Sequence, residues 1–264
     1  MDARYHKGFW RLRIDDLDTP RNVTGATDAI LHCLQRFGLQ WDGEVYFQSQ
    51  HLQQYQQSLA KLQRQEWLYA CRCSRKKLAN SLVYPGYCRQ AGFPDDHTTA
   101  LRLKTQDLTI EFDDALQGNI CQNLALEQGD FVIRRRDQII AYQFAVVIDD
   151  NSQGISHVVR GADLLDSTPK QIYLQQLLGY STPHYLHLPL IVDEHGEKLS
   201  KQTLAAPIDD SQPTATLFFL LKLLQQNPPE NLLSASVQQQ LNWAIAHWQP
   251  QALQKVRAIQ PPIL

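Results

Sequence analysis

Residues 186–202 read LHLPLIVDEHGEKLSKQ, an apolar run followed by a loop that carries two lysines. The apolar part, residues 186–192, has the length and composition of a buried strand. Lys198 and Lys201 stand on either side of a leucine and a serine, and a glycine precedes them, so the loop offers a compact cationic cluster suited to a polyphosphate. Taken alone, such a string is most often a solvated surface loop. The rest of the chain has to decide between these two interpretations.

The composition allows a large folded core and gives no global sign of a nucleic-acid partner. The chain has 264 residues, 43% of them apolar, and a formal net charge of only -2. Any RNA contact would therefore have to be a local basic patch. No apolar run approaches the ~20 residues that cross a bilayer, and the N-terminus lacks the apolar core of a signal peptide. We therefore expect a cytoplasmic protein without a membrane partner.

Strand-like and helix-like segments alternate along the chain, which predicts an α/β fold. Ile30 lies on the apolar face of the first expected helix, so we expect it in the core. The apolar run 139–150 fits either a buried helix or a buried strand, and Asp113 and Asp114 are interpreted as turn residues. We expect helices over residues 24–37, 49–65, 164–178, 216–226 and 237–247, and strands over residues 8–14, 100–104, 108–112, 130–133, 155–159 and 186–192.

Three cysteines gather within one short segment. Cys71 and Cys73 form a Cys-x-Cys pair, and Cys88 follows a Pro-Gly turn. This spacing can provide three corners of a tetrahedral zinc site, and the alternative is three unligated thiols in a loop. The fourth ligand stays open between a tyrosine oxygen of this segment and His97. Basic neighbours would favour thiolates electrostatically. They are Arg72, Arg75, Lys76, Lys77 and Arg89.

Polar residues follow several of the expected strands, at the sheet edge where ligands usually bind in α/β proteins. Strand 8–14 ends in an acidic cluster that begins with Asp15 and could face an amino group, a ribose or a metal, or form a polar turn. Arg160 follows a later strand and is well placed to bind a carboxylate in a bidentate fork. Tyr142 is a polar group within an apolar run and needs a partner. The arginines 134–136 could meet phosphate or form a solvated turn.

Several strings match one known family in order, from about residue 8 to residue 205. They are RIDDLDTPR (13–21), GLQWDG (38–43), Cys71-x-Cys73 with Tyr84-x3-Cys88, AY (141–142), VIDD (147–150), VRGADL (159–164) and KLSKQ (198–202). In these strings the sequence resembles the catalytic half of glutamyl-tRNA synthetases. Among these it is most similar to the shortened paralogues that act on tRNA(Asp).

The resemblance implies a class I synthetase fold with a Rossmann-like parallel sheet, in which ATP with Mg²⁺ and L-glutamate react to glutamyl-adenylate. The shortened paralogues then transfer glutamate to the queuosine at the wobble position of tRNA(Asp). Lys198 and Lys201 match the family's catalytic lysine loop, and Lys201 is implied as an ATP contact. Tyr142 and Arg160 match glutamate-binding residues. Asp15 matches an amino-group contact at which the family usually has glutamate, so its reach is shorter by one methylene.

The resemblance also implies a metal site and a division of the chain. Tyr84 occupies the position of a tyrosine zinc ligand, which implies one structural Zn²⁺ held by Cys71, Cys73, Tyr84 and Cys88. We expect a monomer. We divide the chain into the first part of the catalytic domain (residues 1–70), a zinc-bearing insert (71–130), the second part of the catalytic domain (131–205) and a small α-helical C-terminal region (206–264).

The chain departs from the family at its start, and its length distinguishes it from a discriminating glutamyl-tRNA synthetase. The family opens with a strand and loop that carry Arg-Phe-Ala-Pro-Ser-Pro-Thr-Gly and a His-x-Gly signature. This chain begins beyond them, so we expect a truncated or mis-started sequence that folds or works poorly. Only 62 of the 264 residues follow Gln202, which is too short for a long anticodon-binding region. The alternatives are a fragment of a discriminating glutamyl-tRNA synthetase and a catalytically silent RNA-binding remnant.

Overall fold

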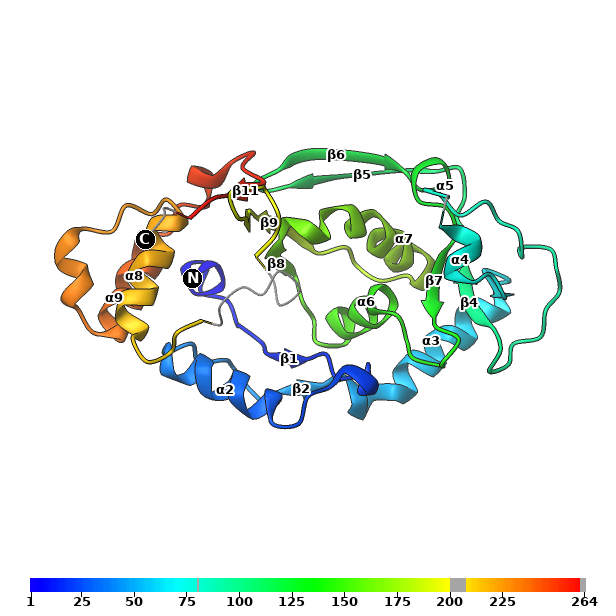
Figure 1. The fold of residues 1–264 in the computed structure, drawn as a ribbon, viewed down its shortest axis with the longest axis horizontal. Helices are drawn as coiled ribbons and strands as arrows, with labels where there is room; N and C mark the ends of the chain where they lie inside the picture. Colours follow the sequence, from blue (N-terminus) through cyan, green and yellow to red (C-terminus); the bar gives the residue numbers. More distant parts are fainter. Residues whose placement is uncertain (80, 200–207, 262–264) are drawn as a thin grey trace.

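A four-stranded sheet with the order β6-β5-β9-β8 extends from the upper edge of the molecule, where β6 and β5 lie, toward its centre (Figure 1). β8 (His157–Gly161) and β9 (His184–Leu188) run parallel and pair along their whole length. β5 (Thr109–Asp114) joins β9 in parallel, and β6 (Gly118–Asn123) returns antiparallel to β5. The predicted α/β fold with parallel strands is therefore confirmed. The computed structural model describes residues 1–79, 81–199 and 208–261.

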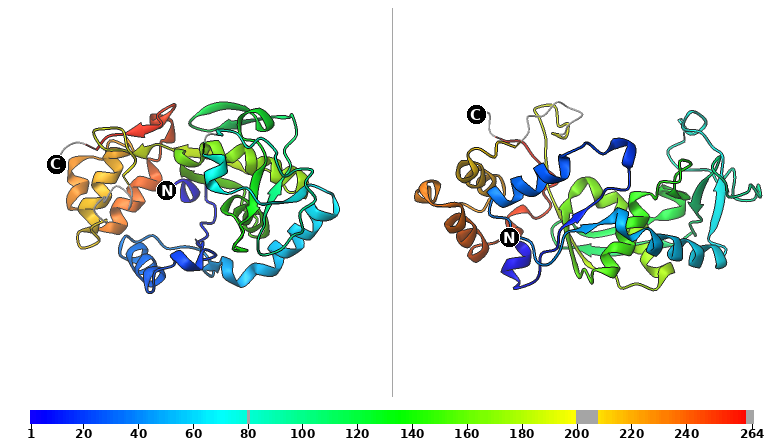
Figure 2. Two further views of the ribbon diagram at one scale, coloured as in Figure 1. Left: turned by 45° about the vertical axis from the view of Figure 1, so that its right-hand side comes forward. Right: turned by 90° about the horizontal axis from the view of Figure 1, so that it is seen from below.

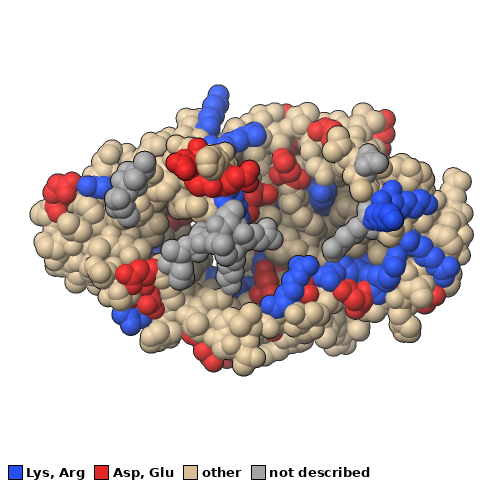
Figure 3. All heavy atoms as spheres, in the orientation of Figure 1, with Lys and Arg blue, Asp and Glu red and all other residues tan. Residues whose placement is uncertain are grey.

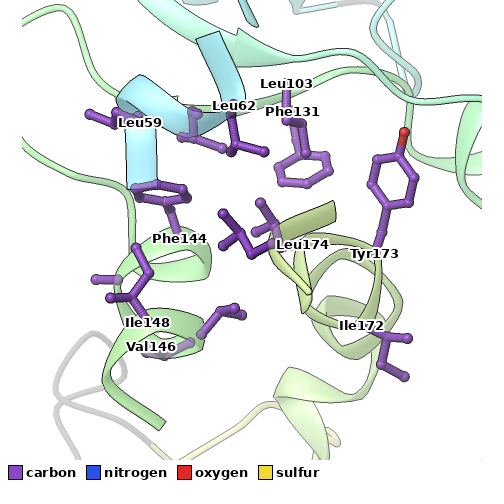
Figure 4. Close-up of a cluster of buried hydrophobic side chains, with 14 of the residues drawn as sticks. Leu59, Leu62, Leu103, Phe131, Phe144, Val146, Ile148, Ile172, Tyr173 and Leu174 are labelled. Carbon is purple, nitrogen blue, oxygen red and sulfur yellow. The ribbon is translucent and has the colours of Figure 1, made fainter. Parts of the chain in front are cut away.

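The main core lies where three helices meet the sheets, and Figure 4 shows its side chains. These helices are α3 (Leu52–Arg64), α6 (Tyr142–Ser152) and α7 (Thr168–Leu178). Phe144 and Leu174 are fully buried between them, and truncation of such a side chain costs about 3–5 kcal/mol. The apolar run 139–150, which fitted either a helix or a strand, forms the helix α6.

A second, three-stranded sheet forms the end of the molecule that carries the cysteines. It contains β3 (Leu68–Cys71), β4 (Ala100–Leu103) and β7 (Phe131–Arg134), which pair antiparallel in that order. Two single-turn helices, α4 (Arg75–Leu78) and α5 (Leu124–Glu127), lie at the same end (Figure 1). The side chain of Ser74 caps α4 by accepting a hydrogen bond from Lys77 N, as is usual at a helix start.

The N-terminal segment forms its own small sheet. β1 (Arg13–Ile14) pairs in parallel with β2 (Tyr46–Phe47), so the strand predicted over residues 8–14 is much shorter than expected. Three short helices lie next to these strands in the sequence: α1 (Asp2–Tyr5) before β1, η1 (Thr19–Arg21) after β1, and η2 (Gln48–His51) after β2. The amphipathic helix α2 (Ala26–Arg36) has no buried residue, and Ile30 is half exposed. The expectation that Ile30 lies in the core is therefore wrong, because the apolar face of α2 is only partly covered.

The C-terminal helices form a separate apolar cluster beside the N-terminus (Figure 2). α8 (Pro213–Leu223) and α9 (Val237–Ala246) confirm the two predicted helices, and Met1 packs against them. Trp248 donates its indole N–H to Asp2 at 2.9 Å. No helix within the described ranges is long and apolar enough to cross a membrane. The short helix η3 (Ala162–Ser167) directly follows β8 in the sequence. The C-terminal region also contains η5 (Glu230–Ser234) and η6 (Pro250–Leu253), and its strand β11 (Ala258–Ile259) pairs in parallel with β10 (Leu190–Ile191).

Candidate active site

The three predicted glutamate-binding residues come from separate parts of the chain, and two of them act electrostatically on the third. Tyr142 is the first residue of α6, and its side chain is 40% exposed. Arg160 lies near the end of β8, and Asp15 directly follows β1. Burial raises the pKa of Tyr142, while the charge of Arg160 opposes that rise and the charge of Asp15 adds to it. Asp15 and Arg160 therefore both lie close enough to Tyr142 to influence its pKa. That the three residues bind glutamate stays a prediction.

Arg13 links β1 to α6 across this region. Its Nε donates to Asp15 Oδ1 at 2.7 Å, and its Nη1 donates to Asp150 Oδ1 at 2.6 Å. Burial disfavours the charged guanidinium, but Asp15 and Asp150 outweigh that effect and raise the pKa of Arg13. A cation shared by two carboxylates fixes both of them. Arg13 therefore sets the position of Asp15, a role that the sequence did not reveal.

Asp149 is a fully buried hydrogen-bond acceptor beneath the site. Its carboxylate accepts from Gln48 Nε2 at 2.7 Å, from Tyr55 Oη at 2.7 Å and from Tyr46 Oη at 3.1 Å. Burial raises the pKa of Asp149, and the hydrogen bonds from Tyr55 and Gln48 oppose that rise. Because its partners come from β2, η2 and α3, Asp149 joins these elements to α6. An aspartate inside an apolar run was the only signal of this role.

Arg160 is held by residues from β9 and α7. Its Nε donates to His187 Nε2 at 3.0 Å, and its Nη2 donates to Thr168 Oγ1 at 2.8 Å. His187 is fully buried, and its Nδ1 lies 2.6 Å from Asp114 Oδ2. Asp114 is 3% exposed and closes β5, whereas Asp113 is exposed. Asp114 does serve the turn after β5, because its Oδ1 accepts the backbone N–H groups of Leu116 and Gln117. The sequence did not show that its buried Oδ2 also accepts from His187. Asp113 lies within β5, so its interpretation as a turn residue is wrong.

The lysine loop begins close to the end of β8. Lys198 Nζ lies 2.5 Å from Asp163 Oδ2, three residues after Arg160. The backbone of residues 193–199 folds back on itself, because Leu199 N donates to Ile191 O and Glu197 N donates to Asp193 Oδ1, both at 2.9 Å. The described part of the loop therefore lies near the residues that follow β8. Lys201 lies outside the described residues.

The three cysteines and Tyr84 come together in one cluster. The sulfurs of Cys71, Cys73 and Cys88 lie within 4.8 Å of one another, and Tyr84 Oη lies 3.4 Å from Cys71 Sγ and 3.7 Å from Cys73 Sγ. Zinc–sulfur bonds of about 2.3 Å in a tetrahedral site separate two sulfurs by roughly 3.8 Å. The four side chains therefore fit a Zn²⁺ ion. His97, the other ligand considered from the sequence, is exposed and is not part of this group.

Arg102 is the basic residue that contacts this cluster, and the sequence did not single it out. Its Nε donates to Cys71 Sγ at 3.3 Å, and its guanidinium carbon lies 3.7 Å from the centre of the Tyr84 ring. Burial opposes ionisation of Cys71, but hydrogen bonds from Tyr84, Cys73 N and Arg102 lower its pKa to about 7. By contrast, the predicted neighbours Arg72 and Arg89 pair with Asp96 and Asp130.

Basic side chains gather on one face, toward the end that carries α4 (Figure 3). Arg72, Lys76, Lys77 and Arg136 are exposed, and Arg136 Nη2 donates to Arg72 O at 3.1 Å. We call these four residues the basic surface. The other two arginines of the run 134–136 form ion pairs: Arg134 with Asp95, and Arg135 with Asp18 and Asp137.

The sheet and the motifs at its strand ends place the chain among the class I tRNA synthetases. The family of tRNA synthetases class I (E and Q), catalytic domain, matches residues 1–82 and 89–225. The chain belongs to the glutamyl-Q tRNA(Asp) synthetases, which are ligases of this class. It is 49% identical to the glutamyl-Q tRNA(Asp) synthetase of Pseudomonas paraeruginosa over 249 residues, or 94% of this chain and 85% of that protein. It is 47% identical to that of Ectopseudomonas mendocina over 260 residues, or 98% and 88%.

Solved structures support the fold. The glutamate tRNA ligase of Elizabethkingia meningosepticum superposes with a TM-score of 0.77 over 99% of this chain at 22% identity. The glutamate-tRNA synthetase of Elizabethkingia anophelis gives a TM-score of 0.78 over 98% of this chain at 22% identity. The chain spans 62% of the length of each of these proteins. At this level of identity the likeness is one of fold alone.

Proposed function

We propose that this chain activates L-glutamate with ATP and Mg²⁺ to glutamyl-adenylate and transfers the glutamyl group to the queuosine at the wobble position of tRNA(Asp). The observation that carries the proposal is the 47–49% identity, over 94–98% of the chain, to proteins named glutamyl-Q tRNA(Asp) synthetase. The convergence of Asp15, Tyr142 and Arg160 supports glutamate as the amino acid. A cation and an anion in one region suit a substrate with both carboxylate and ammonium groups.

In the proposed glutamate complex Arg160 binds a substrate carboxylate. Nε and Nη2 of its guanidinium donate to His187 and Thr168. Within the described part of the chain, no residue accepts a hydrogen bond from Nη1, which is therefore available to a ligand. Tyr142 offers its phenol from the start of α6, and Asp15, held by Arg13, faces the ammonium group. A hydrogen bond to a charged group such as this guanidinium is worth about 1.5–3 kcal/mol.

ATP activation is assigned to the lysine loop. As pyrophosphate leaves, negative charge grows on the phosphates, and a nearby ammonium group stabilises that charge. Lys198 stands near the strand end that carries Arg160, where the phosphates and the glutamate carboxylate would have to meet. Lys201, whose role rests on the resemblance alone, is the second cation of the loop. Mg²⁺ would accompany ATP as part of the substrate complex.

The cysteine cluster is assigned a structural Zn²⁺ held by Cys71, Cys73, Tyr84 and Cys88. The support is the fit of these four side chains to a tetrahedral site and the contact of Arg102 with Cys71. A bound Zn²⁺ would crosslink the segment after β3 and thereby stabilise the fold. The basic surface is suited to RNA phosphates, because its four cations are exposed.

The amino acid is tested by glutamate-dependent ATP–pyrophosphate exchange. We expect Arg160→Lys to raise the KM for glutamate by about 10- to 100-fold, because lysine keeps the charge but loses the planar fork. The exposed Arg257 provides the matched control, and Arg257→Lys should leave the KM unchanged. Exchange that another amino acid supports in place of glutamate would overturn the proposed amino acid. No exchange with any amino acid would favour the silent remnant.

The acceptor is tested by transfer of labelled glutamate to tRNA(Asp) with and without queuosine. We expect transfer only to the queuosine-bearing tRNA. The same reaction with tRNA(Glu) tests the alternative that the chain is a fragment of a discriminating glutamyl-tRNA synthetase. Such a fragment would attach glutamate to the 3′ end of tRNA(Glu). Transfer to tRNA(Glu), or equal transfer to tRNA(Asp) without queuosine, would refute the proposed acceptor.

A further inference from the structure

We propose that Asp114 and His187 are positioning residues that fix the guanidinium of Arg160 for glutamate binding. The inference rests on the proposed role of Arg160 and goes beyond it by assigning two buried residues that no substrate would touch. Arg160 and His187 are direct partners in the register of β8 and β9. Asp114, at the end of β5, lies beside the same part of β9. It pairs with Tyr185, and this is the only register pair between β5 and β9 in the described part of the chain.

The hydrogen bonds fix the tautomer of His187. A guanidinium can only donate, so His187 Nε2, 3.0 Å from Arg160 Nε, must accept and carries no proton. The remaining ring proton of the neutral imidazole is then on Nδ1, which donates to Asp114 Oδ2 at 2.6 Å. The carboxylate therefore selects the only neutral tautomer that can hold Arg160. Asp114 acts on Arg160 through the ring, although the two side chains do not touch.

Asp114 is itself locked in orientation. Its Oδ1 accepts backbone N–H groups from Gln117 at 2.8 Å, Leu116 at 3.0 Å and His187 at 3.3 Å. In an Asp114→Asn variant these three donors would keep the amide oxygen at the Oδ1 position. The amide NH₂ would then face His187 Nδ1 and donate to it, which moves the ring proton to Nε2. Two donors, His187 Nε2–H and Arg160 Nε–H, would then face each other.

The first experiment combines NMR with kinetics of Asp114→Asn in the full chain. ¹⁵N spectra of the imidazoles report the tautomer of His187, whose signal is assigned by its loss in His187→Gln. We expect a switch from Nδ1–H to Nε2–H and a rise of about tenfold or more in the KM for glutamate in pyrophosphate exchange, with the KM for ATP within about twofold. Asp113→Asn, the same change at the exposed neighbouring position, should alter neither.

The second experiment replaces His187 itself. Glutamine can place an acceptor near the position of Nε2, whereas asparagine is too short and can reach only Asp114. We expect His187→Gln to keep the KM for glutamate within about fivefold of wild type and His187→Asn to raise it by about tenfold or more. A residue that merely fills space would show equal effects in the two variants, and equal effects would overturn the proposal.

The outcomes separate this inference from the proposed function. If Arg160→Lys leaves the KM for glutamate unchanged, the role of Arg160 is wrong and the inference falls with it. If Arg160→Lys raises that KM but Asp114→Asn switches the tautomer without raising it, only the positioning role is wrong. A raised KM in Asp114→Asn without a tautomer switch would also overturn it, because the effect would then not pass through the ring.

Discussion

Replacing Asp149 with alanine should destabilise the fold more than the loss of any exposed carboxylate. The side chain is fully buried and accepts three hydrogen bonds, from Gln48, Tyr55 and Tyr46. In Asp149→Ala the amide of Gln48 and the hydroxyl of Tyr55 lose the carboxylate that accepts their hydrogen bonds. Both groups are buried, so water cannot readily replace it. The variant therefore removes the link between α6 and the segments of β2, η2 and α3.

The magnitude follows from the number and kind of these bonds. A hydrogen bond to a charged acceptor contributes about 1.5–3 kcal/mol, so the two 2.7 Å bonds together are worth roughly 3–6 kcal/mol. The burial that raises the pKa of Asp149 shows that the charge is itself costly to bury, which offsets part of this sum. We expect the free energy of unfolding to fall by about 3–5 kcal/mol, as is usual when a buried charge network loses its central member.

Urea denaturation followed by tryptophan fluorescence measures this change, since the chain has five tryptophans. Tyr55→Phe removes one of the two short bonds and should cost about 1–3 kcal/mol. Asp137→Ala removes an exposed carboxylate that pairs with Arg135 at 2.6 Å and should cost less than about 1 kcal/mol. If Asp149→Ala costs no more than Asp137→Ala, Asp149 does not join these elements.

Three further predictions concern the metal, acid stability and one glycine. Cys73→Ser should reduce bound zinc from one equivalent to a small fraction in metal analysis, while the exposed Cys121→Ser should not. Burial works to raise the pKa of Asp114, but hydrogen bonds from His187 and backbone N–H groups lower it below its ordinary value of 3.8. Wild type should therefore lose stability as the pH falls below about 4 and through the folded-state pKa, and this loss should be smaller in Asp114→Asn. Gly38→Ala should raise the unfolded fraction in thermal melts more than Gly154→Ala. Both glycines have positive φ, but an added Cβ meets side-chain carbons at 2.9–3.0 Å only at Gly38; the difference should be about 1–3 kcal/mol.

Each of these three predictions can be contradicted by a specific result. Full zinc content in Cys73→Ser would exclude that thiol as a ligand. An acid unfolding curve of Asp114→Asn parallel to that of wild type would show that this carboxyl does not govern acid stability. Equal melting temperatures for the two glycine variants would mean that the helix α9 moves away from Gly38 without loss.

Sequence patterns predicted those helices and strands whose apolar residues recur at a regular spacing, or whose ends are marked by residues that start or stop an element. Helices α8 and α9 and the strand β4 lie within a few residues of the predicted ranges. The pattern could not show how much of each face is covered, which is why the apolar face of α2 is less buried than expected. Periodicity describes one element, whereas burial depends on its partners.

Some residues of the candidate site could likewise be predicted from the sequence, and others could not. Residues within motifs, such as Arg160 and the cysteines, could be named from the sequence because their types and spacing carry the chemistry. Asp114, His187 and Arg102 could not, because each gains its role from a residue at least 27 positions away in the chain. A lone aspartate at the end of a strand is most often a turn residue. Only the pairing of β5 with β9 shows that this aspartate also bonds to His187, which in turn accepts from Arg160.

The ion pair between Arg13 and Asp150 has a consequence for the order of folding. Its two residues are 137 positions apart, and the bond from Tyr46 to Asp149 spans 103 positions. The hairpin of β5 and β6 closes through a turn of three residues, so it can form early at little loss of chain entropy. Contacts that close very long loops form late. A partly folded chain can therefore contain most of its strands and helices while the segment that holds Asp15 is still detached, and competence to bind glutamate would be among the last properties the chain acquires.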